Sequence, residues 1–203
     1  MRLSFYLNSD ACSGCKTCQV ACKDKNALAA GVHWRRVYEV TAGGWTRSGP
    51  AWVPDVAAYY LSVSCLHCAI PACADQCSVD AIWKRPDGVV LIDQERCTKC
   101  YKCEADCPYG AITHERPGDP VGKCDFCLDE IDGGRPPACV AACPNRALAF
   151  GDLLDLRKAH GVVDRVFPLA DPSRAEPSVV ITPHRQAASM QERSPAVANW
   201  EEV

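Results

Sequence analysis

Sixteen cysteines carry the chemistry that this sequence of 203 residues can perform. They form four groups of four, and each group begins Cys-x-x-Cys and ends Cys-x-x-x-Cys. Cysteine binds metals as the thiolate, and short loops of this kind can turn several sulfur atoms toward one site. The groups are, in chain order, Cys12, Cys15, Cys18 and Cys22; Cys65, Cys68, Cys73 and Cys77; Cys97, Cys100, Cys103 and Cys107; and Cys124, Cys127, Cys139 and Cys143.

The repeat extends beyond the thiols. The last cysteine of the second, third and fourth groups is followed by "SVDAI", "PYGAI" and "PNRAL", and the first group continues with "KDKNAL", one residue longer. Self-similarity of this kind indicates that one structural unit has been used four times.

The spacing within the third group, "CTKCYKCEADC", favours an iron-sulfur cluster. Three thiolates of a Cys-x-x-Cys-x-x-Cys loop can converge on one cluster, while the fourth cysteine begins a helical turn and points elsewhere. In two-cluster bacterial ferredoxins, that fourth cysteine binds the neighbouring cluster. Sixteen cysteines at four per cubane give four 4Fe-4S clusters with no thiol left over. The first and fourth groups would have to pair in space if they follow the same crossover.

Zinc and disulfides are the alternative uses of these cysteines. Zinc sites of four thiolates are usually built from two separated Cys-x-x-Cys knuckles. Disulfides would fit a secreted protein, but "MRLSFYLNSDAC" shows no secretory signal. We therefore favour iron-sulfur clusters. His67 lies inside "CLHC" and could be a ligand, but thiols already fill every cubane position, so we expect it to hydrogen-bond or pack beside a cluster.

The rest of the composition narrows the function. Leu, Ile, Val and Phe make up only about a fifth of the chain, so we expect the clusters to help hold the fold. The formal net charge is -3 with no basic block that would suggest nucleic acid. No apolar segment reaches the roughly 18 to 20 residues of a membrane span. Five cations beside the cysteines could offset the clusters' negative charge or simply be solvated: Lys16, Lys99, Lys102, Lys123 and Arg146.

The common catalytic motifs are missing from the sequence. It has no Gly-rich phosphate loop, no His-Glu-x-x-His motif and no Gly-x-Ser-x-Gly elbow. We therefore expect no catalytic residue in this chain, and no enzymatic activity of its own.

Short elements must hold the cysteine loops. A turn at "RPDG" leads into the strand "VVLID", and "DLLDLRKAHG" predicts one helix that a glycine stops. The segments "WRRVYEV" and "AWVPDVAAYYLSV", joined by an "AGGW" turn, predict a strand pair that covers the cluster loops. We expect Trp34, Trp45 and Trp52 to pack there rather than to bind a cofactor. The Pro-rich tail predicts an arm that wraps a partner instead of packing on its own domain.

Together these elements predict an α+β fold of two ferredoxin-like modules, each binding two 4Fe-4S clusters, with a β-rich insertion and an extended C-terminal arm. One module is discontinuous and combines residues 1–30 with 118–151. The other spans 59–117, and the insertion covers 31–58. The C-terminal helix and the partner-binding arm cover 152–203.

Several longer stretches carry a resemblance to a known family. They include "CSGCKTCQVACKD", "WRRVYE", "YYLSVSCLHC", "GKCDFC", "PPACVAACPNRALAFG" and "SVVITP". In these stretches the chain resembles the iron-sulfur (B) subunits of the dimethyl sulfoxide reductase family of molybdenum enzymes. The cysteine motifs taken singly are shared with many polyferredoxins, whereas the insertion and the C-terminal extension narrow the resemblance to this family.

The resemblance implies a ligand pattern in which each cluster takes three cysteines of one group and the last cysteine of a partner group. Related nitrate reductase subunits have Trp at the position of Cys100 and hold a 3Fe-4S centre, so a full cubane is implied here. Ser78 stands where the family usually has Pro. Because Pro supplies no ligand, this difference affects the prediction of the local turn and not that of the cluster ligands. The implied sets are Cys12, Cys15, Cys18 with Cys143; Cys22 with Cys124, Cys127, Cys139; Cys65, Cys68, Cys73 with Cys107; and Cys77 with Cys97, Cys100, Cys103.

The resemblance also implies a role. The chain would relay electrons between a membrane anchor subunit that oxidises quinol and a catalytic subunit that carries molybdopterin. The complex would be membrane-associated, on the extracytoplasmic face by co-export with the catalytic subunit, with the cytoplasm as the alternative. A polyferredoxin-type subunit of a hydrogenase or formate-oxidising complex is the alternative function. The long C-terminal extension favours the first role, because a free shuttle has little use for it.

Overall fold

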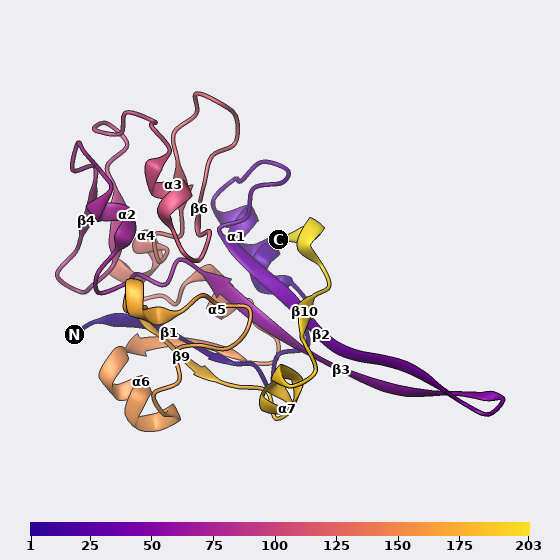
Figure 1. Ribbon diagram of the computed structural model, residues 1–203. Coiled ribbons are helices and arrows are strands. Elements are labelled where there is room, and N and C mark those ends of the chain that lie inside the picture. The colour runs from indigo at the N-terminus through magenta and orange to yellow at the C-terminus, as the bar shows by residue number, and fades with distance from the viewer.

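A three-stranded sheet pairs the N-terminal strand with two strands from the last third of the chain in the computed structural model, which describes residues 1–203 with all side chains except that of Pro172 (Figure 1). The strands are β1 (Leu3–Asn8), β8 (Leu148–Asp152) and β9 (Val179–Thr182), in the order β8-β1-β9. β1 runs antiparallel to β8 and parallel to β9. The sheet therefore fastens the end of the fourth cysteine group and the C-terminal region to the N-terminal strand.

The core lies between this sheet and the cysteine loops. Phe5 and Leu7 of β1 are buried, and the Phe5 ring stacks on that of Phe126 with 4.1 Å between centroids. Phe126 belongs to the fourth cysteine group and is completely buried. The aromatic stack therefore fixes one cysteine loop directly to the sheet.

The cysteine groups carry short helices that pack in pairs. Helix α1 (Thr17–Lys25) packs on α5 (Ala138–Ala141), and α2 (Ala72–Asp75) packs on α3 (Lys102–Asp106). A further helix, α4 (Leu128–Asp132), follows the Cys-x-x-Cys of the fourth group. The first pair joins groups one and four, and the second joins groups two and three.

Two small hairpins complete the region of the second and third groups. Strand β4 (Ile82–Lys84) pairs with β5 (Val90–Ile92), which confirms the strand expected in "VVLID". Strand β6 (Ile112–Thr113) pairs with β7 (Gly122–Lys123). Their buried side chains form a second core: Ile82, Val90, Cys103, Ile112 and Val121.

The predicted helix after the fourth group is present as α6 (Leu153–His160). The Asp152 carboxylate caps its first turn by accepting a hydrogen bond from the Leu154 N–H, and the helix ends at Gly161. The glycine is the signal by which the sequence predicted the end of this helix.

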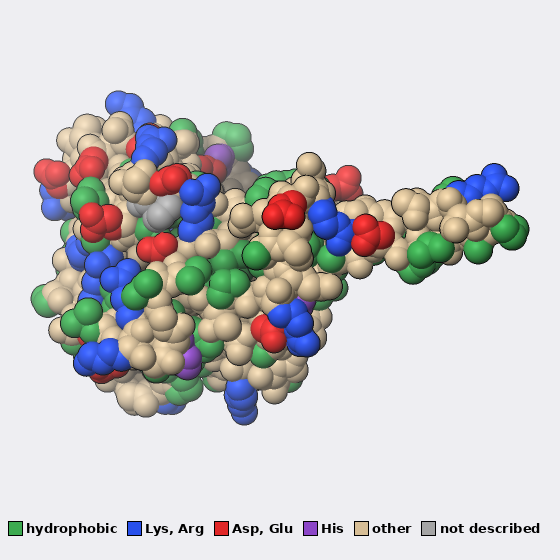
Figure 2. Space-filling model, turned by 60° about the horizontal axis from the view of Figure 1, so that its bottom comes forward, with side chains coloured by type: hydrophobic (Ala, Val, Ile, Leu, Met, Phe, Trp, Pro, Cys, Tyr) green, Lys and Arg blue, Asp and Glu red, His purple; other side chains and the backbone are tan. Residues whose placement is uncertain are grey.

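The predicted strand pair is a much longer hairpin than expected. Strands β2 (Arg35–Ser48) and β3 (Ala51–Ser64) pair over their whole length, and the outer half projects from the body as an arm (Figures 1 and 2). The turn lies at residues 49–50 and not at "AGGW". Gly43 has φ +82°, and a Cβ there would lie 1.9 Å from the Asp55 carbonyl oxygen, so this glycine serves a close approach within the strands.

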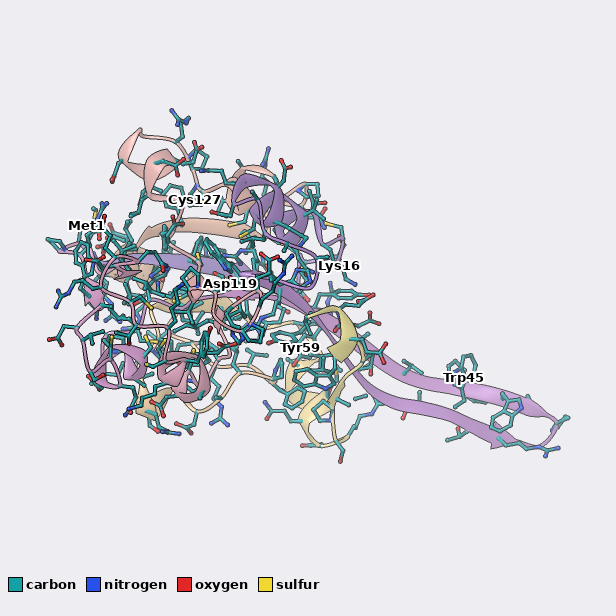
Figure 3. All side chains as sticks on the ribbon, turned by 90° about the horizontal axis from the view of Figure 1, so that it is seen from above. Met1, Lys16, Trp45, Tyr59, Asp119 and Cys127 are labelled. Atoms are coloured by element: carbon teal, nitrogen blue, oxygen red, sulfur yellow. The ribbon has the colours of Figure 1, made fainter. Side chains whose placement is uncertain are left out.

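The prediction that all three tryptophans pack is wrong for two of them. Trp45 lies on the projecting part of the hairpin (Figure 3), and Trp52 lies in the same outer half; 62% and 63% of their surfaces are exposed. Trp34 is half-buried and lies against Gly122 of β7. Only the inner part of the hairpin can therefore cover the cysteine loops.

The C-terminal region folds back on its own chain, so the prediction of an extended tail that does not pack on its own domain is wrong. Besides β9, it contains η1 (Pro172–Arg174), α7 (Ala187–Gln191), β10 (Ala196–Val197) and η2 (Trp200–Glu202). β10 pairs with β2, and the α7 residue Met190 is completely buried. The apolar residues of "SVVIT" add a parallel strand to the sheet, and this long-range pairing outweighs the Pro-rich composition. No helix in the described residues has the length and apolar composition of a bilayer-spanning segment.

Candidate metal centres

Each cysteine loop has the same unusual backbone turn. The residue just before the second cysteine has a left-handed conformation in all four groups: Gly14 at φ +69°, His67 at +41°, Lys99 at +58° and Phe126 at +69°. Only one of the four is glycine, so three groups accept a conformation that L-residues seldom adopt. Alternating right- and left-handed residues gather successive N–H groups into a concave nest that suits anions, iron-sulfur clusters among them.

A second turn recurs after the last cysteine. Three residues further on, Asp80, Gly110 and Arg146 all have positive φ, at 49°, 55° and 51°. In the second and third groups the next N–H donates to the sulfur of the last cysteine, from Ala81 to Cys77 Sγ at 3.2 Å and from Ala111 to Cys107 Sγ at 3.4 Å. The repeated "SVDAI", "PYGAI" and "PNRAL" therefore share one turn, which in the second and third groups supplies a hydrogen bond to the sulfur of the last cysteine.

The structure gathers twelve of the cysteines around three cavities of about 20 Å³ each. Each cavity is lined by three cysteines of one group and the last cysteine of another. Site 1 contains Cys12, Cys15, Cys18 and Cys143; site 3 contains Cys65, Cys68, Cys73 and Cys107; and site 4 contains Cys77, Cys97, Cys100 and Cys103. The three sets are those that the family resemblance implied.

The remaining four cysteines are all buried, and we refer to them together as site 2: Cys22, Cys124, Cys127 and Cys139. Burial, opposed by the charge of Arg35 and assisted by the charges of Cys139 and Cys127, raises the pKa of Cys22 to about 12. Burial likewise raises the pKa of Cys124 well above its usual value, with contributions from Cys22 and Cys139. The four thiols therefore lie within electrostatic reach of one another.

The shape of these sites fits a cubane better than a zinc ion. Four thiolates of a zinc site lie about 2.3 Å from one ion, whereas the sulfur atoms of sites 1, 3 and 4 surround a cavity. Among the described residues, no three Cys, His, Asp or Glu side chains are arranged to hold a single metal ion. Apolar residues such as Val37 and Leu148 at site 1, and Ile82 and Val121 at site 4, complete the walls.

The four sites follow one another in the order 1-2-3-4. In three cross-site pairs, the charge of one thiol adds to burial in raising the pKa of the other. Cys139 acts on Cys18, Cys65 acts on Cys124, and Cys103 acts on Cys73. These pairs link site 1 to site 2, site 2 to site 3, and site 3 to site 4. The exposed cysteines lie at the two ends, Cys15 in site 1 and Cys100 in site 4.

The two exposed thiols differ electrostatically from the buried ones. Hydrogen bonds from Thr17 lower the pKa of Cys15, and the backbone N–H of Lys102 lowers the pKa of Cys100. Burial instead raises the pKa of Cys68 and of Cys73 to about 12. Binding iron at the inner sites must therefore displace protons from the thiols, as metal binding to cysteine generally does.

The histidine inside the second group behaves as predicted. The His67 ring is buried, and its Nδ1 accepts a hydrogen bond from the Val90 N–H at 3.0 Å. Its ring also meets Phe126 edge to face, with 5.3 Å between centroids. The side chain therefore ties the β5 strand to the fourth group.

The five cations singled out in the sequence fall into three kinds: exposed, ion-paired and buried. Lys99, Lys102 and Arg146 are exposed, and Lys16 forms an ion pair with Glu202. Lys123 is only 4% exposed and donates to the carbonyl oxygens of Val90 and Cys124. The interpretation as solvated surface charge therefore fits the first three and is wrong for Lys123.

A second buried cation, Arg35 of β2, was not among the residues singled out in the sequence. Its side chain lies between sites 1 and 2 with 2% of its surface exposed. The available signal was its position two residues before the apolar Val37, which puts both side chains on one face of a strand.

Comparison with known proteins agrees with this geometry. Residues 56–153 match the family described as a 4Fe-4S dicluster domain. Together with the sixteen cysteines, this match defines an iron-sulfur protein that carries four 4Fe-4S clusters and transfers electrons.

The full-length relatives specify the family. The B subunit of anaerobic dimethyl sulfoxide reductase from Escherichia coli is 41% identical over 199 residues, covering 98% of this chain and 97% of the relative. The corresponding B subunit of Haemophilus influenzae is 38% identical over 98% of both proteins. The formate dehydrogenase iron-sulfur subunit of Wolinella succinogenes is 34% identical over 74% of this chain and 82% of the relative. The protein therefore belongs to the family of dimethyl sulfoxide reductase iron-sulfur (B) subunits, which are not catalytic on their own.

Proposed function

We propose that this chain relays electrons between a quinol-oxidising membrane subunit and a molybdopterin-containing catalytic subunit of a dimethyl sulfoxide reductase-like complex. The observation that carries the proposal is the row of four cysteine sites with an exposed cysteine at each end. When bound, 4Fe-4S clusters supply one-electron oxidation and reduction steps. A row of sites with two exposed ends and a buried middle suits transfer between two partners.

We assign one cluster to each site, with the four cysteines of that site as its ligands. For sites 1, 3 and 4 the assignment is supported by cavities of equal size, each lined by four thiols. For site 2 it is supported by the burial of all four cysteines and by the packing of α1 on α5. Within this arrangement α1 carries Cys18 of site 1 and Cys22 of site 2, so one helix fixes the spacing of two clusters.

The proposed docking positions of the partners follow from exposure. Cys15 and Cys100 lie at the surface, whereas every cysteine of site 2 is buried. A partner that covers Cys15 or Cys100 would bring its own redox group near a terminal cluster without disturbing the inner sites. The buried thiols of site 2 and the partly buried thiols of site 3 keep water and oxidants away from the middle of the path.

We further propose that the complex is attached to the membrane through the anchor subunit, on the extracytoplasmic face after co-export with the catalytic subunit. The family resemblance supports this location. The two ferredoxin-like modules are supported by the two helix pairs, each of which carries two sites.

A second candidate function is a subunit of a formate-oxidising complex. The 34% identity to the Wolinella formate dehydrogenase subunit favours it, but that alignment covers 74% of this chain against 98% for the Escherichia coli dimethyl sulfoxide reductase subunit. The long C-terminal region is a weaker argument for the first function than the sequence suggested, because it packs on its own chain and not outward as an arm.

The test is to isolate the complex anaerobically through a tag on this chain and to identify its partners. We expect a molybdopterin protein and a membrane subunit to co-purify, and quinol to reduce the clusters of the intact complex. Re-oxidation of the reduced clusters by a sulfoxide or an N-oxide would favour the dimethyl sulfoxide reductase-like complex. Reduction of the clusters by formate would favour the formate-oxidising complex. Recovery of this chain without any molybdopterin protein under gentle conditions would refute the proposal.

A further inference from the structure

One buried cation, the guanidinium of Arg35, forms no ion pair with a carboxylate among the described residues. The Arg35 guanidinium hydrogen-bonds only neutral groups of β3: Nη1 donates to Ser62 Oγ at 3.1 Å, and Nη2 donates to Ser64 Oγ at 2.9 Å. It lies over the Phe5 ring at 4.6 Å from the centroid. Its Nε is buried without a hydrogen-bond partner, and no carboxylate in the described residues pairs with it.

Burying a cation among neutral groups is strongly unfavourable unless an anion lies nearby. The groups that face Arg35 are cysteines of two sites, Cys18 of site 1 and Cys22, Cys124 and Cys139 of site 2. Burial by itself lowers the pKa of Arg35, but the charges of these thiolates outweigh burial and raise it above its ordinary value. An arrangement that is costly without metal becomes favourable once the cysteines bind as thiolates.

A hydrogen-bonded bridge also connects Arg35 to a site 1 ligand. Ser62 Oγ lies 3.1 Å from Arg35 Nη1 and 3.2 Å from Cys18 Sγ. Ser62 also lines the cavity of site 1. The guanidinium is therefore held in place by the same serine that touches a sulfur of site 1.

We propose that Arg35 is a fixed counter-charge that raises the reduction potentials of the clusters in sites 1 and 2. The inference rests on the ligand sets proposed for those two sites. A reduced cluster carries one more negative charge than an oxidised one, so a nearby cation in a low-dielectric interior stabilises the reduced form. Arginine stays protonated at any working pH, so the guanidinium keeps this charge throughout.

The test compares three variants of the full chain in its complex, with the potentials followed by electron paramagnetic resonance during redox titration. Arg35→Gln removes the charge, and Arg35→Lys keeps a charge with different hydrogen bonds. Arg36→Gln is the matched control, because it removes the same charge one residue along the strand, where the side chain donates to the Tyr109 carbonyl oxygen at 2.6 Å. Signals are assigned to sites beforehand with single cysteine replacements in a chain that retains Arg35.

We expect Arg35→Gln to shift two of the four signals, those of sites 1 and 2, to lower potential. The reduction equilibrium should change at least tenfold, which is about 59 mV for a one-electron couple. Arg35→Lys should restore most of the shift, and Arg36→Gln should leave these two signals in place. If Arg35→Gln fails to assemble, assembly of four clusters near wild-type potentials in Arg35→Lys supports the role of the charge.

Three results would overturn the proposal. One is an Arg35→Gln protein with four clusters at unchanged potentials. Another is an Arg35→Lys protein that assembles but has potentials as low as those of the glutamine variant. The third is failure of both variants to assemble, because the site would then require the shape of arginine and not its charge. The cysteine replacements test the ligand sets separately, so a wrong ligand set and a wrong role for Arg35 give different results.

Discussion

Replacing Cys107 by serine gives the sharpest test of the crossover between cysteine groups. Cys107 ends the third group in sequence, but it lines the cavity of site 3 with three cysteines of the second group. The other cysteines of its own group, including Cys100, line site 4. Cys107→Ser should therefore damage the cluster of site 3 and leave site 4 intact.

The magnitude follows from the cluster count. Loss of one of four equal clusters removes one quarter of the iron, and conversion to a three-iron centre removes one iron from that cluster. Either outcome changes one of four paramagnetic signals. Sites 2 and 4 flank site 3, because Cys124 interacts with Cys65 and Cys73 interacts with Cys103. Their signals should therefore lose a magnetic neighbour but keep their own iron.

The matched control is Cys100→Ser, an exposed ligand of site 4 from the same group. Both variants would be purified anaerobically and compared by iron analysis and by electron paramagnetic resonance after graded reduction. They should affect two different signals. If both replacements remove or alter the same signal, the crossover assignment is wrong, whatever the total loss of iron.

Three further predictions test the fold around the sites. Met190→Ala should lower the free energy of unfolding by about 2–5 kcal/mol, as other buried large-to-small changes do. The measurement is a urea titration, with the exposed Glu192→Ala as the control. If the two variants are equally stable, the C-terminal region does not pack as described. Gly43→Val should disrupt the hairpin and make it easier to cleave by protease, because a Cβ at this position would lie 1.9 Å from the Asp55 carbonyl oxygen. Gly44→Val is the control, because a Cβ there has open space. Equal proteolysis of the two variants would contradict this expectation. Removing the iron by chelation should increase the hydrodynamic radius, because cysteines form part of both cores. An unchanged radius would show that the clusters do not stabilise the fold.

The sequence predicted the local parts of this structure well. Helix α6 and strand β5 were recognisable because a glycine ends the helix and a polar turn precedes the strand. The cysteine spacing anticipated the turns that surround each site, because a Cys-x-x-Cys loop fixes its own backbone over a few residues. The conformation of residues such as Phe126, left-handed without being glycine, gave no signal in the sequence.

The errors arose where distant segments meet. The C-terminal tail was read from its proline content, but Val179 and its neighbours pair with a strand near the N-terminus. The length of the β2–β3 hairpin was hidden because Gly43 resembled a turn signal. Arg35 was overlooked because its importance depends on Ser62 and Ser64 of the opposite strand and on thiols from two cysteine groups. No local pattern contains such contacts.

The base of the hairpin connects three of the four sites, which gives the insertion a role beyond covering the loops. Ser62 of β3 contacts Cys18 of site 1, and Ser62 and Ser64 together hold Arg35 against the thiols of site 2. The residue that follows the strand, Cys65, is the first cysteine of site 3. Because residues 62–65 reach three sites, a shift of β3 would change the spacing of those sites together. The long pairing with β2 therefore stabilises the geometry on which electron transfer between neighbouring sites depends.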